Sequence, residues 1–442
     1  MNWSRPRRNP VLAIPNLWHL LNLASSPFFQ DRLTPVGDPV HPIDLFVGRG
    51  AEVELLLRTI GSSEGSRQAI PGAVGRGKTT LAQYVKSELG KARYLAANEP
   101  VGVGSVDTAA ELLVRILSSA YQTVLTHGDS TTGGLEPMKV ARQLLRAFQT
   151  QGGSISIGLS GIGSIGAGIS KSFVTGPAAL SALAPGLLRE IGLVAQDHIG
   201  AKGLIIHLNN LENLSEANAD RAARVMRDLR DTALLVPGIH YLLVGADEAV
   251  RSVVQSQPQL RSVFHVLPPL APLSDGDLLE LLQRRYEHLR LDPERPVHPP
   301  ATEGAVLEVY GLFRGDLRGT FGALEQAAVR LIGVAGELPT DPMDREAVRS
   351  VLHGVYTDEM ESALGQVDLE FLQRLAQTFA EQAFTQAEVE AHTQVPLTTI
   401  SDAFGRLVPQ GFILVLGKRA AAGPGRRPVE YGLSGAVHLA FA

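Results

Sequence analysis

Residues 72–79 carry the clearest chemical signal in the chain, because Gly-Ala-Val-Gly-Arg-Gly-Lys-Thr matches the phosphate-binding pattern G-x-x-x-x-G-K-[ST]. Glycines allow a turn tight enough for several backbone N–H groups to point at one polyphosphate. The lysine would reach the β- and γ-phosphates, and the threonine hydroxyl would ligate Mg²⁺. The predicted cofactor-binding residues of this loop are Gly72, Gly75, Arg76, Gly77, Lys78, Thr79 and Thr80, with Thr79 as the metal ligand.

The elements around this loop must position it. Residues 80–89 have apolar side chains at helical spacing, so a helix is expected to begin beneath the phosphates, where its dipole and orphan N–H groups favour an anion. Short apolar runs typical of buried parallel strands alternate with helical patterns up to residue 244. The expected strands are 68–70, 93–97, 204–208 and 240–244, and the expected helices are 53–60, 109–124, 138–148 and 219–235. This alternation predicts an α/β fold with a parallel sheet covered on both faces.

The second half of the chain predicts two further parts. Residues 277–289 and 302–331 are helical without an intervening strand, which indicates a helical lid. Three short helices over 368–379, 385–392 and 396–408 precede two strands, 412–416 and 429–433, as in a winged helix. The expected organisation is a lead-in over 1–44 that packs on the next domain, a nucleotide-binding domain over 45–270, a lid over 271–360 and a winged-helix domain over 361–442.

A glycine-rich insertion over 152–176 interrupts the nucleotide-binding domain. Isoleucine and leucine alternate there with small residues, which favours a hairpin with one apolar face. Three interpretations stay open: a hairpin packed on the core, a loop that contacts a subunit or DNA, and an amphipathic membrane contact.

Composition narrows the class of protein. The chain has 442 residues, of which 44% are hydrophobic and 19% charged, and it has no window of about 18 apolar residues that would span a membrane. The lack of cysteine excludes disulfides, thiolate zinc sites and thiol catalysis, and favours a cytoplasmic location. With a net charge of −5, binding to nucleic acid must rest on a local basic patch.

The segment Phe46-Val47-Gly48-Arg49, about 25 residues before the loop, resembles the Phe-x-Gly-Arg box of AAA+ ATPases of the origin-recognition and archaeal replication-initiator branch. STAND-type switch ATPases carry the same box. The resemblance implies that these four residues lie against the adenine and help to select ATP. A plain turn before a helix is the alternative.

Two arginines take roles by the same resemblance. Gly315-Asp-Leu-Arg318 resembles the sensor-2 motif, in which an arginine of the lid contacts the γ-phosphate. Arg314 is expected to be a surface cation. Arg261 lies where AAA+ proteins often carry the arginine that reaches into a neighbouring subunit's site, and a surface arginine is the alternative. The lid lacks the Gly-x-Pro motif of STAND proteins, which favours the initiator-like branch.

The strand over 203–208 departs from the family at its end. Asn209 and Asn210 follow it, where the resembling families have the acids that hold the Mg²⁺ shell and orient the attacking water. An amide carries no negative charge and cannot act as a general base. Glu212 is the candidate substitute. Asp247 is the first polar residue after the next strand, so the usual sensor-1 Asn or Thr is missing as well. Slow or absent hydrolysis is expected.

The C-terminal helices and hairpin contain a basic cluster. It consists of Arg406, Lys418, Arg419, Arg426 and Arg427, with Thr398, Thr399 and Ser401 on the third helix as further contacts to phosphate or base. Contact with double-stranded DNA, contact with protein and a merely solvated loop are the three interpretations.

These observations predict a protein that binds ATP and Mg²⁺ and contacts double-stranded DNA under ATP control. It would act as a loader, regulator or scaffold in replication, transposition or mobile-element defence, as a homo-oligomer or with partner proteins. A STAND-like signalling switch whose winged helix contacts protein is the alternative, and a productive motor is the third.

Overall fold

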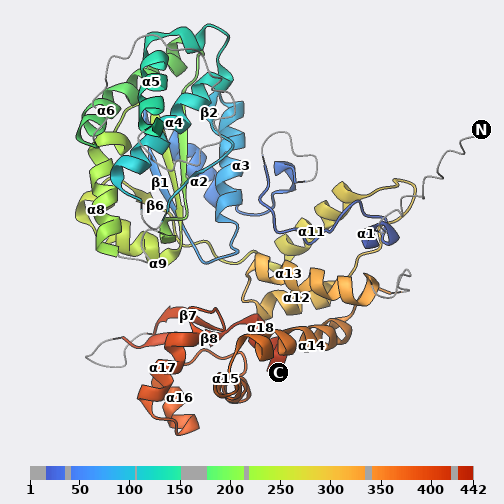
Figure 1. Cartoon of the computed structure of the whole chain (residues 1–442). Coiled ribbons are helices and arrows are strands. Elements are labelled where there is room, and N and C mark those ends of the chain that lie inside the picture. The colour runs from blue at the N-terminus through green and yellow to red at the C-terminus, as the bar shows by residue number, and fades with distance from the viewer. Residues whose placement is uncertain are drawn as a thin grey trace, which may run out of the picture. The chain divides into compact units, whose positions relative to one another are not determined.

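The computed structural model describes residues 16–34, 41–104, 107–150, 177–213, 219–333, 341–419 and 427–441. The chain divides into two compact units (Figure 1). One comprises Asp31–Asp277, and the other comprises Met1–Gln30 with Leu278–Ala442. The glycine-rich insertion over 152–176 lies outside the described residues.

The first unit is built on a parallel sheet. Its strands are β1 (Arg67–Pro71), β2 (Tyr94–Ala96), β3 (Val101–Gly102), β4 (Gly203–Asn209), β5 (Ile239–Gly245) and β6 (His265–Val266). They are arranged in the order β2-β4-β5-β1-β6, with β3 also paired to β4, and every pairing is parallel. Nearly every residue of β4 and β5 is buried, as expected for strands with helices on both sides.

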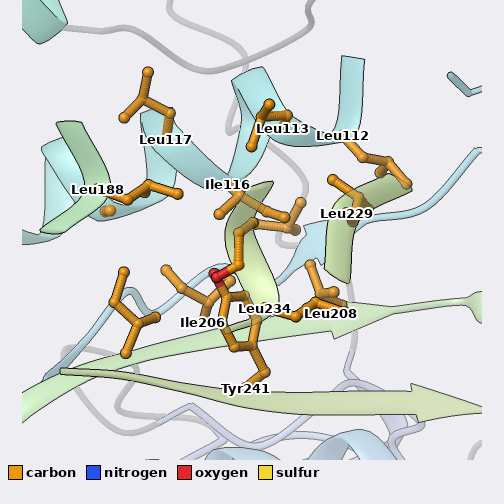
Figure 2. Close-up of a cluster of buried hydrophobic side chains, with 14 of the residues drawn as sticks. Leu112, Leu113, Ile116, Leu117, Leu188, Ile206, Leu208, Leu229, Leu234 and Tyr241 are labelled. Atoms are coloured by element: carbon orange, nitrogen blue, oxygen red, sulfur yellow. The ribbon is translucent and has the colours of Figure 1, made fainter. Parts of the chain in front are cut away.

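Helices cover both faces of this sheet (Figure 1). On one face, α2 (Gly50–Gly61) and α3 (Lys78–Lys91) pack on apolar residues of β1, β4 and β5. The other face is covered by α4 (Ala109–His127), α5 (Glu136–Thr150), α6 (Pro177–Leu193) and α8 (Ala219–Leu229). Figure 2 shows Ile206 and Leu208 of β4 meeting Ile116 of α4 in this larger core. The predicted α/β fold is confirmed.

The alternation of side chains along β4 places polar residues on the face of α3. Successive side chains of a strand point to opposite faces. Ile206 and Leu208 belong to the core beneath α4, whereas Ile205 packs with α3. His207 and Asn209 therefore share the α3 face of the sheet.

The second unit is mainly helical. Its helices are α1 (Leu17–Leu20), α11 (Asp275–Leu289, which begins at the end of the first unit), α12 (Glu303–Leu312), α13 (Leu317–Ala328), α14 (Arg345–Ala363), α15 (Gln366–Phe379), α16 (Gln386–Thr393), α17 (Leu397–Leu407) and α18 (Gly435–Phe441). An antiparallel hairpin of β7 (Ile413–Lys418) and β8 (Val429–Leu433) follows α17, with a bulge between Val415 and Gly417. A single bridge from Phe384 to Tyr431 joins the α15–α16 connection to the hairpin.

The described residues 16–30 of the lead-in belong to the second unit. The Asn22 amide donates to the carbonyls of Asp292 and Arg295 at 3.0 Å each, and Phe28 stacks on Phe321 with ring centroids 6.2 Å apart. Arg285 is buried over the Phe29 ring, and burial lowers its pKa to about 9. Residues 16–30 thus pack on α11, the segment after it and α13 within their own unit, whereas the lead-in was expected to pack on the next domain in the sequence.

Two predicted helices are not regular α-helices over their whole length. The helix expected over 219–235 is α-helical to Leu229 and π-helical from there to Leu234. The run over 302–331 is broken between Leu312 and Leu317, where Arg314 and Gly315 have positive φ. No helix among the described residues is long and apolar enough to cross a membrane.

Candidate nucleotide site

The phosphate loop connects β1 to α3 in the geometry that its sequence predicts. Gly75 and Gly77 have φ values of +70° and +77°, a region that side chains with a Cβ rarely adopt. Gly77 caps the N-terminus of α3, whose first residue is Lys78. The loop therefore directs the first N–H groups of a 14-residue helix, and the positive end of its dipole, to one spot.

Lys78 lies across the loop that precedes it. Its Nζ donates to the carbonyls of Gly72 and Ala73 at 2.8 Å each. Gly72 is needed for a close approach, because a Cβ there would lie 3.3 Å from backbone and side-chain atoms of Leu270. The ammonium group is thus held at the mouth of the loop, where it can bind an anion.

The Phe-x-Gly-Arg box is joined directly to the loop. The Arg49 guanidinium is only 7% exposed, donates to the Arg76 carbonyl at 3.2 Å and also donates to the Ala271 carbonyl. Phe46 stacks on Tyr84 of α3 with centroids 4.2 Å apart and an interplanar angle of 18°. An aromatic pair beside the loop suits a nucleobase, and the adenine role of the box stays a prediction.

Close packing also constrains the middle of the box. Val47 is buried, and Gly48 has a φ of +73°. A Cβ on Gly48 would lie 3.2 Å from Leu273 and Asp277.

Asn209, at the end of β4, has its side-chain amide next to the phosphate loop. The Thr79 hydroxyl lies 3.5 Å from Asn209 Oδ1, so these two side chains occupy the place where a metal and its ligands are expected. Asn210 is exposed and has a φ of +65°, a left-handed conformation that asparagine tolerates better than most residues. The two asparagines therefore differ: Asn209 faces the loop, and Asn210 makes a turn.

Glu212 is engaged with the end of β5. Its Oε2 accepts a hydrogen bond from the Ala246 N–H at 2.9 Å. The structure brings Glu212 to the correct edge of the sheet, but its carboxylate has a structural partner there. Asp247 begins α9 (Asp247–Val250) at the same edge and is exposed.

A buried polar group lies beneath Asn209 on the same face. Lys86 of α3 is 4% exposed and donates to the Asn98 carbonyl at 3.1 Å, and the Gln83 amide donates to the same oxygen at 2.8 Å. Burial and the nearby Arg32 lower the Lys86 pKa to about 7. His207 is fully buried, which lowers its pKa, and neither ring nitrogen has a hydrogen-bond partner among the described residues.

No role is predicted for Gln83 and Lys86 from the sequence. The available signal was their spacing, four and seven residues after Thr79, which puts all three on one face of the helix.

The predicted arginines lie in different units. Arg261 is exposed at the end of α10 (Pro258–Arg261) in the first unit. Arg318 is exposed in the first turn of α13 in the second unit, and its backbone N–H donates to Asp316 Oδ1 at 2.9 Å. Both arginine roles stay predictions. Arg314 is not the expected surface cation: it is half-buried, donates to the Glu381 carbonyl at 2.8 Å, and burial lowers its pKa.

Two of the predicted DNA-contacting cations form ion pairs within their unit. Arg406 binds Asp368 through two hydrogen bonds of 3.0 and 2.6 Å. Arg419 bonds Glu388 at 2.6 Å and Glu430 at 2.9 Å.

The other predicted contacts remain at the surface. In the described part of the hairpin Lys418 and Arg427 have no such partner, and Arg427 is exposed, whereas Arg426 lies outside the described residues. Thr398, Thr399 and Ser401 are exposed on α17, around the buried Ile400.

The residues present fit a nucleotide better than they fit a metal. The loop amides, the α3 N-terminus and Lys78 suit phosphate groups, and the stack of Phe46 on Tyr84 suits a base. For Mg²⁺ the site offers a hydroxyl and an amide oxygen, whereas protein Mg²⁺ sites usually use one or two carboxylates with the substrate phosphates.

No protein-family model and no curated protein match the chain. Among solved structures it is similar to the ORC2 protein of Aeropyrum pernix in ADPNP–ADP complexes, with 16% identity and a TM-score of 0.49 over 94% of this chain and 95% of that one. It is also similar to the RuvB Holliday junction branch migration motor of Thermotoga maritima (14%, 0.42, 89% and 96%). A Walker-type ATPase of Pyrococcus abyssi is a third (13%, 0.44, 94% and 99%). Because all three TM-scores are below 0.5, the function proposed below is argued from the geometry of the site alone.

Proposed function

We propose that this chain is an ATP-binding AAA+ protein that acts as a nucleotide-gated, DNA-associated switch with slow or absent hydrolysis. The observation that carries the proposal is the 3.5 Å approach of Thr79 to Asn209, which sets an amide where hydrolysis needs a carboxylate, beside a phosphate loop whose Gly75 and Gly77 have positive φ. A loader, regulator or scaffold in replication, transposition or mobile-element defence fits this role.

The first unit supplies the groups for binding. The loop N–H groups and Lys78 hold the phosphates, and Phe46 with Tyr84 holds the base. Neither Asn209 nor Asn210 can take a proton from water, because an amide has no basic lone pair at neutral pH. Glu212 accepts a hydrogen bond from the Ala246 N–H at the end of β5, and we propose that it does not replace the missing base. ATP therefore acts as a ligand that shifts the population between conformations.

Two arginines would couple the bound ligand to assembly. Arg318 would bind the γ-phosphate when the lid closes, because a guanidinium grips phosphate through two parallel N–H donors. Arg261, exposed at the end of its helix, would extend toward a neighbouring copy. Both groups distinguish ATP from ADP only if they touch the terminal phosphate.

DNA contact is proposed for the three helices and hairpin at the C-terminus. Lys418 and Arg427 can each neutralise a phosphate, and the exposed hydroxyls of α17 can donate to the backbone. Their small number favours weak, sequence-tolerant binding that depends on oligomerisation.

A STAND-like signalling switch is the alternative, and one observation favours it. Arg406 and Arg419 are held by carboxylates of their own unit, which reduces the positive charge that this surface offers to DNA. A surface with paired charges suits contact with protein better than contact with nucleic acid.

Phosphate release at saturating ATP tests the switch against the motor. We expect a rate at least a hundredfold below the ~1–100 s⁻¹ of productive phosphoryl-transfer enzymes. A rate within that range would overturn the proposed loss of hydrolysis.

Duplex DNA binding across a salt series, with and without ATP, tests the DNA role. Each lost phosphate contact lowers the slope of log K against log salt by about 0.9, so the double variant K418A/R427A should lower it by about 2. The double variant R189A/K202A removes two exposed cations of the other unit and should leave the slope unchanged. Negligible binding of the wild-type chain at every salt concentration would exclude DNA and favour the protein-contact alternative.

A further inference from the structure

The metal position beside the phosphate loop is electrically neutral. Thr79 offers a hydroxyl oxygen, and Asn209 offers an amide oxygen 3.5 Å away. Mg²⁺ is a hard, strongly hydrated cation that protein sites hold through one or two carboxylates together with substrate phosphates. These two neutral oxygens supply no charge to offset its dehydration.

Neighbouring carboxylates on this edge are bound elsewhere. Glu212 accepts from the Ala246 N–H. Asp107, on the segment after β3, is buried and holds Arg115 through two bonds of 2.8 and 2.6 Å, and it accepts the Gly104 N–H at 2.6 Å. Moving either carboxylate toward Asn209 would break these bonds and leave their partly buried donors without these partners.

Another described acid at this edge differs from both. Asp247 is exposed in the first turn of α9, where the positive end of a helix dipole faces it.

The groups below Asn209 supply no net negative charge for a metal. Lys86 is buried on the same face of α3 as Thr79, seven residues further along, and burial lowers its pKa to about 7. Arg32, which also lowers that pKa, is paired with Glu99. A helix rises about 1.5 Å per residue, so the backbone of Lys86 lies on the order of 10 Å from that of Thr79.

We infer that this site binds adenine nucleotide without Mg²⁺, with Lys78, the loop amides and the α3 N-terminus as the main phosphate-binding groups of the first unit. The inference rests on the proposed nucleotide binding and adds that the ligand is the free polyphosphate anion. The Asn209 amide fits this state, because its N–H₂ group can donate to a phosphate oxygen whereas an aspartate at the same place would repel it.

The experiment compares nucleotide affinity in excess EDTA and in excess Mg²⁺, with a fluorescent ATP analogue as the probe and the full chain as the protein. We expect the two dissociation constants to agree within threefold. In Asn209→Asp we expect binding in EDTA to weaken at least tenfold and to recover when Mg²⁺ is added, because the new carboxylate repels phosphate unless a cation lies between them. Asn210→Asp places the same charge on the exposed neighbour and should behave like the wild-type chain.

Paramagnetic Mn²⁺ gives an independent readout. With ADP present, Asn209→Asp should bind one Mn²⁺ and the wild-type chain should bind none above the level of free nucleotide. Far-UV circular dichroism shows that each variant is folded. Wild-type binding that weakens tenfold or more in EDTA would overturn the inference and leave the proposed function intact. Absence of nucleotide binding in both media would overturn both.

Discussion

The two halves of the proposed nucleotide site differ in the kinds of residue that they contain. The half formed by β1 and α3 keeps its glycines at positive φ, its lysine at the mouth of the loop and its aromatic pair. The half formed by the ends of β4 and β5 has the amides Asn209 and Asn210, and its Glu212 is hydrogen-bonded to the backbone. Because different elements supply the two halves, one can change without disturbing the other. Binding needs backbone shape and a cation, whereas hydrolysis needs placed carboxylates.

Removing Lys78 should have the largest effect and tests whether the loop half carries the binding. Its ammonium forms charge-assisted hydrogen bonds to phosphate, so Lys78→Ala should weaken nucleotide binding by about 3 kcal/mol, or roughly a hundredfold. Anisotropy of a fluorescent ATP analogue measures this. Lys202→Ala removes an exposed lysine of the same unit and should change affinity less than twofold. A loss below threefold in Lys78→Ala would mean that the other half contributes most of the binding.

The buried Lys86 gives a second test of the comparison, because its titration makes the stability of the packing between α3 and β4 depend on pH. Burial holds its folded-state pKa near 7, below the ordinary 10.5, so the unfolded chain binds more protons between these values. The free energy of unfolding should therefore rise with pH across this window, and the contribution of Lys86 should be about 4 kcal/mol.

Urea unfolding of the full chain from pH 6 to pH 10 measures this rise, followed by far-UV circular dichroism. In Lys86→Met the lysine-dependent part should vanish, so the variant should exceed the wild type most at pH 6. Lys91→Met changes an exposed lysine of the same helix and should keep the wild-type pH dependence. Equal pH profiles for Lys86→Met and the wild type would show that Lys86 does not titrate in this window.

The features that the sequence predicts are those encoded by local spacing. The loop, the parallel strands and the three helices with their hairpin follow from glycine positions and from apolar periodicity. A Thr-x-x-Glu pattern at the start of α16 is one such local signal, and Thr385 and Glu388 form a capping box there.

Ion pairs between residues that are distant in the sequence cannot be predicted from local spacing. Arg406 pairs with a carboxylate 38 residues away and Arg419 with one 31 residues away. A basic run shows charge, but whether that charge stays available depends on the tertiary fold. The same holds for Lys86, whose residue type indicates a solvated helix face although the fold buries it. The strand β6, with two residues, is too short for any periodicity.

Substitutions of Asn210 should have the smallest effect. They test whether this residue of the β4 half matters for its backbone conformation or for its side-chain amide. Its φ of +65° is a left-handed conformation that glycine adopts freely, asparagine tolerates, and alanine adopts at a cost of about 1–2 kcal/mol. Asn210→Gly should therefore change the free energy of unfolding by less than about 0.5 kcal/mol and nucleotide affinity by less than twofold, whereas Asn210→Ala should destabilise the chain by about 1 kcal/mol. Urea unfolding and analogue binding measure both quantities. If Asn210→Gly instead weakened nucleotide binding tenfold with unchanged stability, the amide would be a binding group, and the β4 half would contribute to the ligand as directly as the loop does.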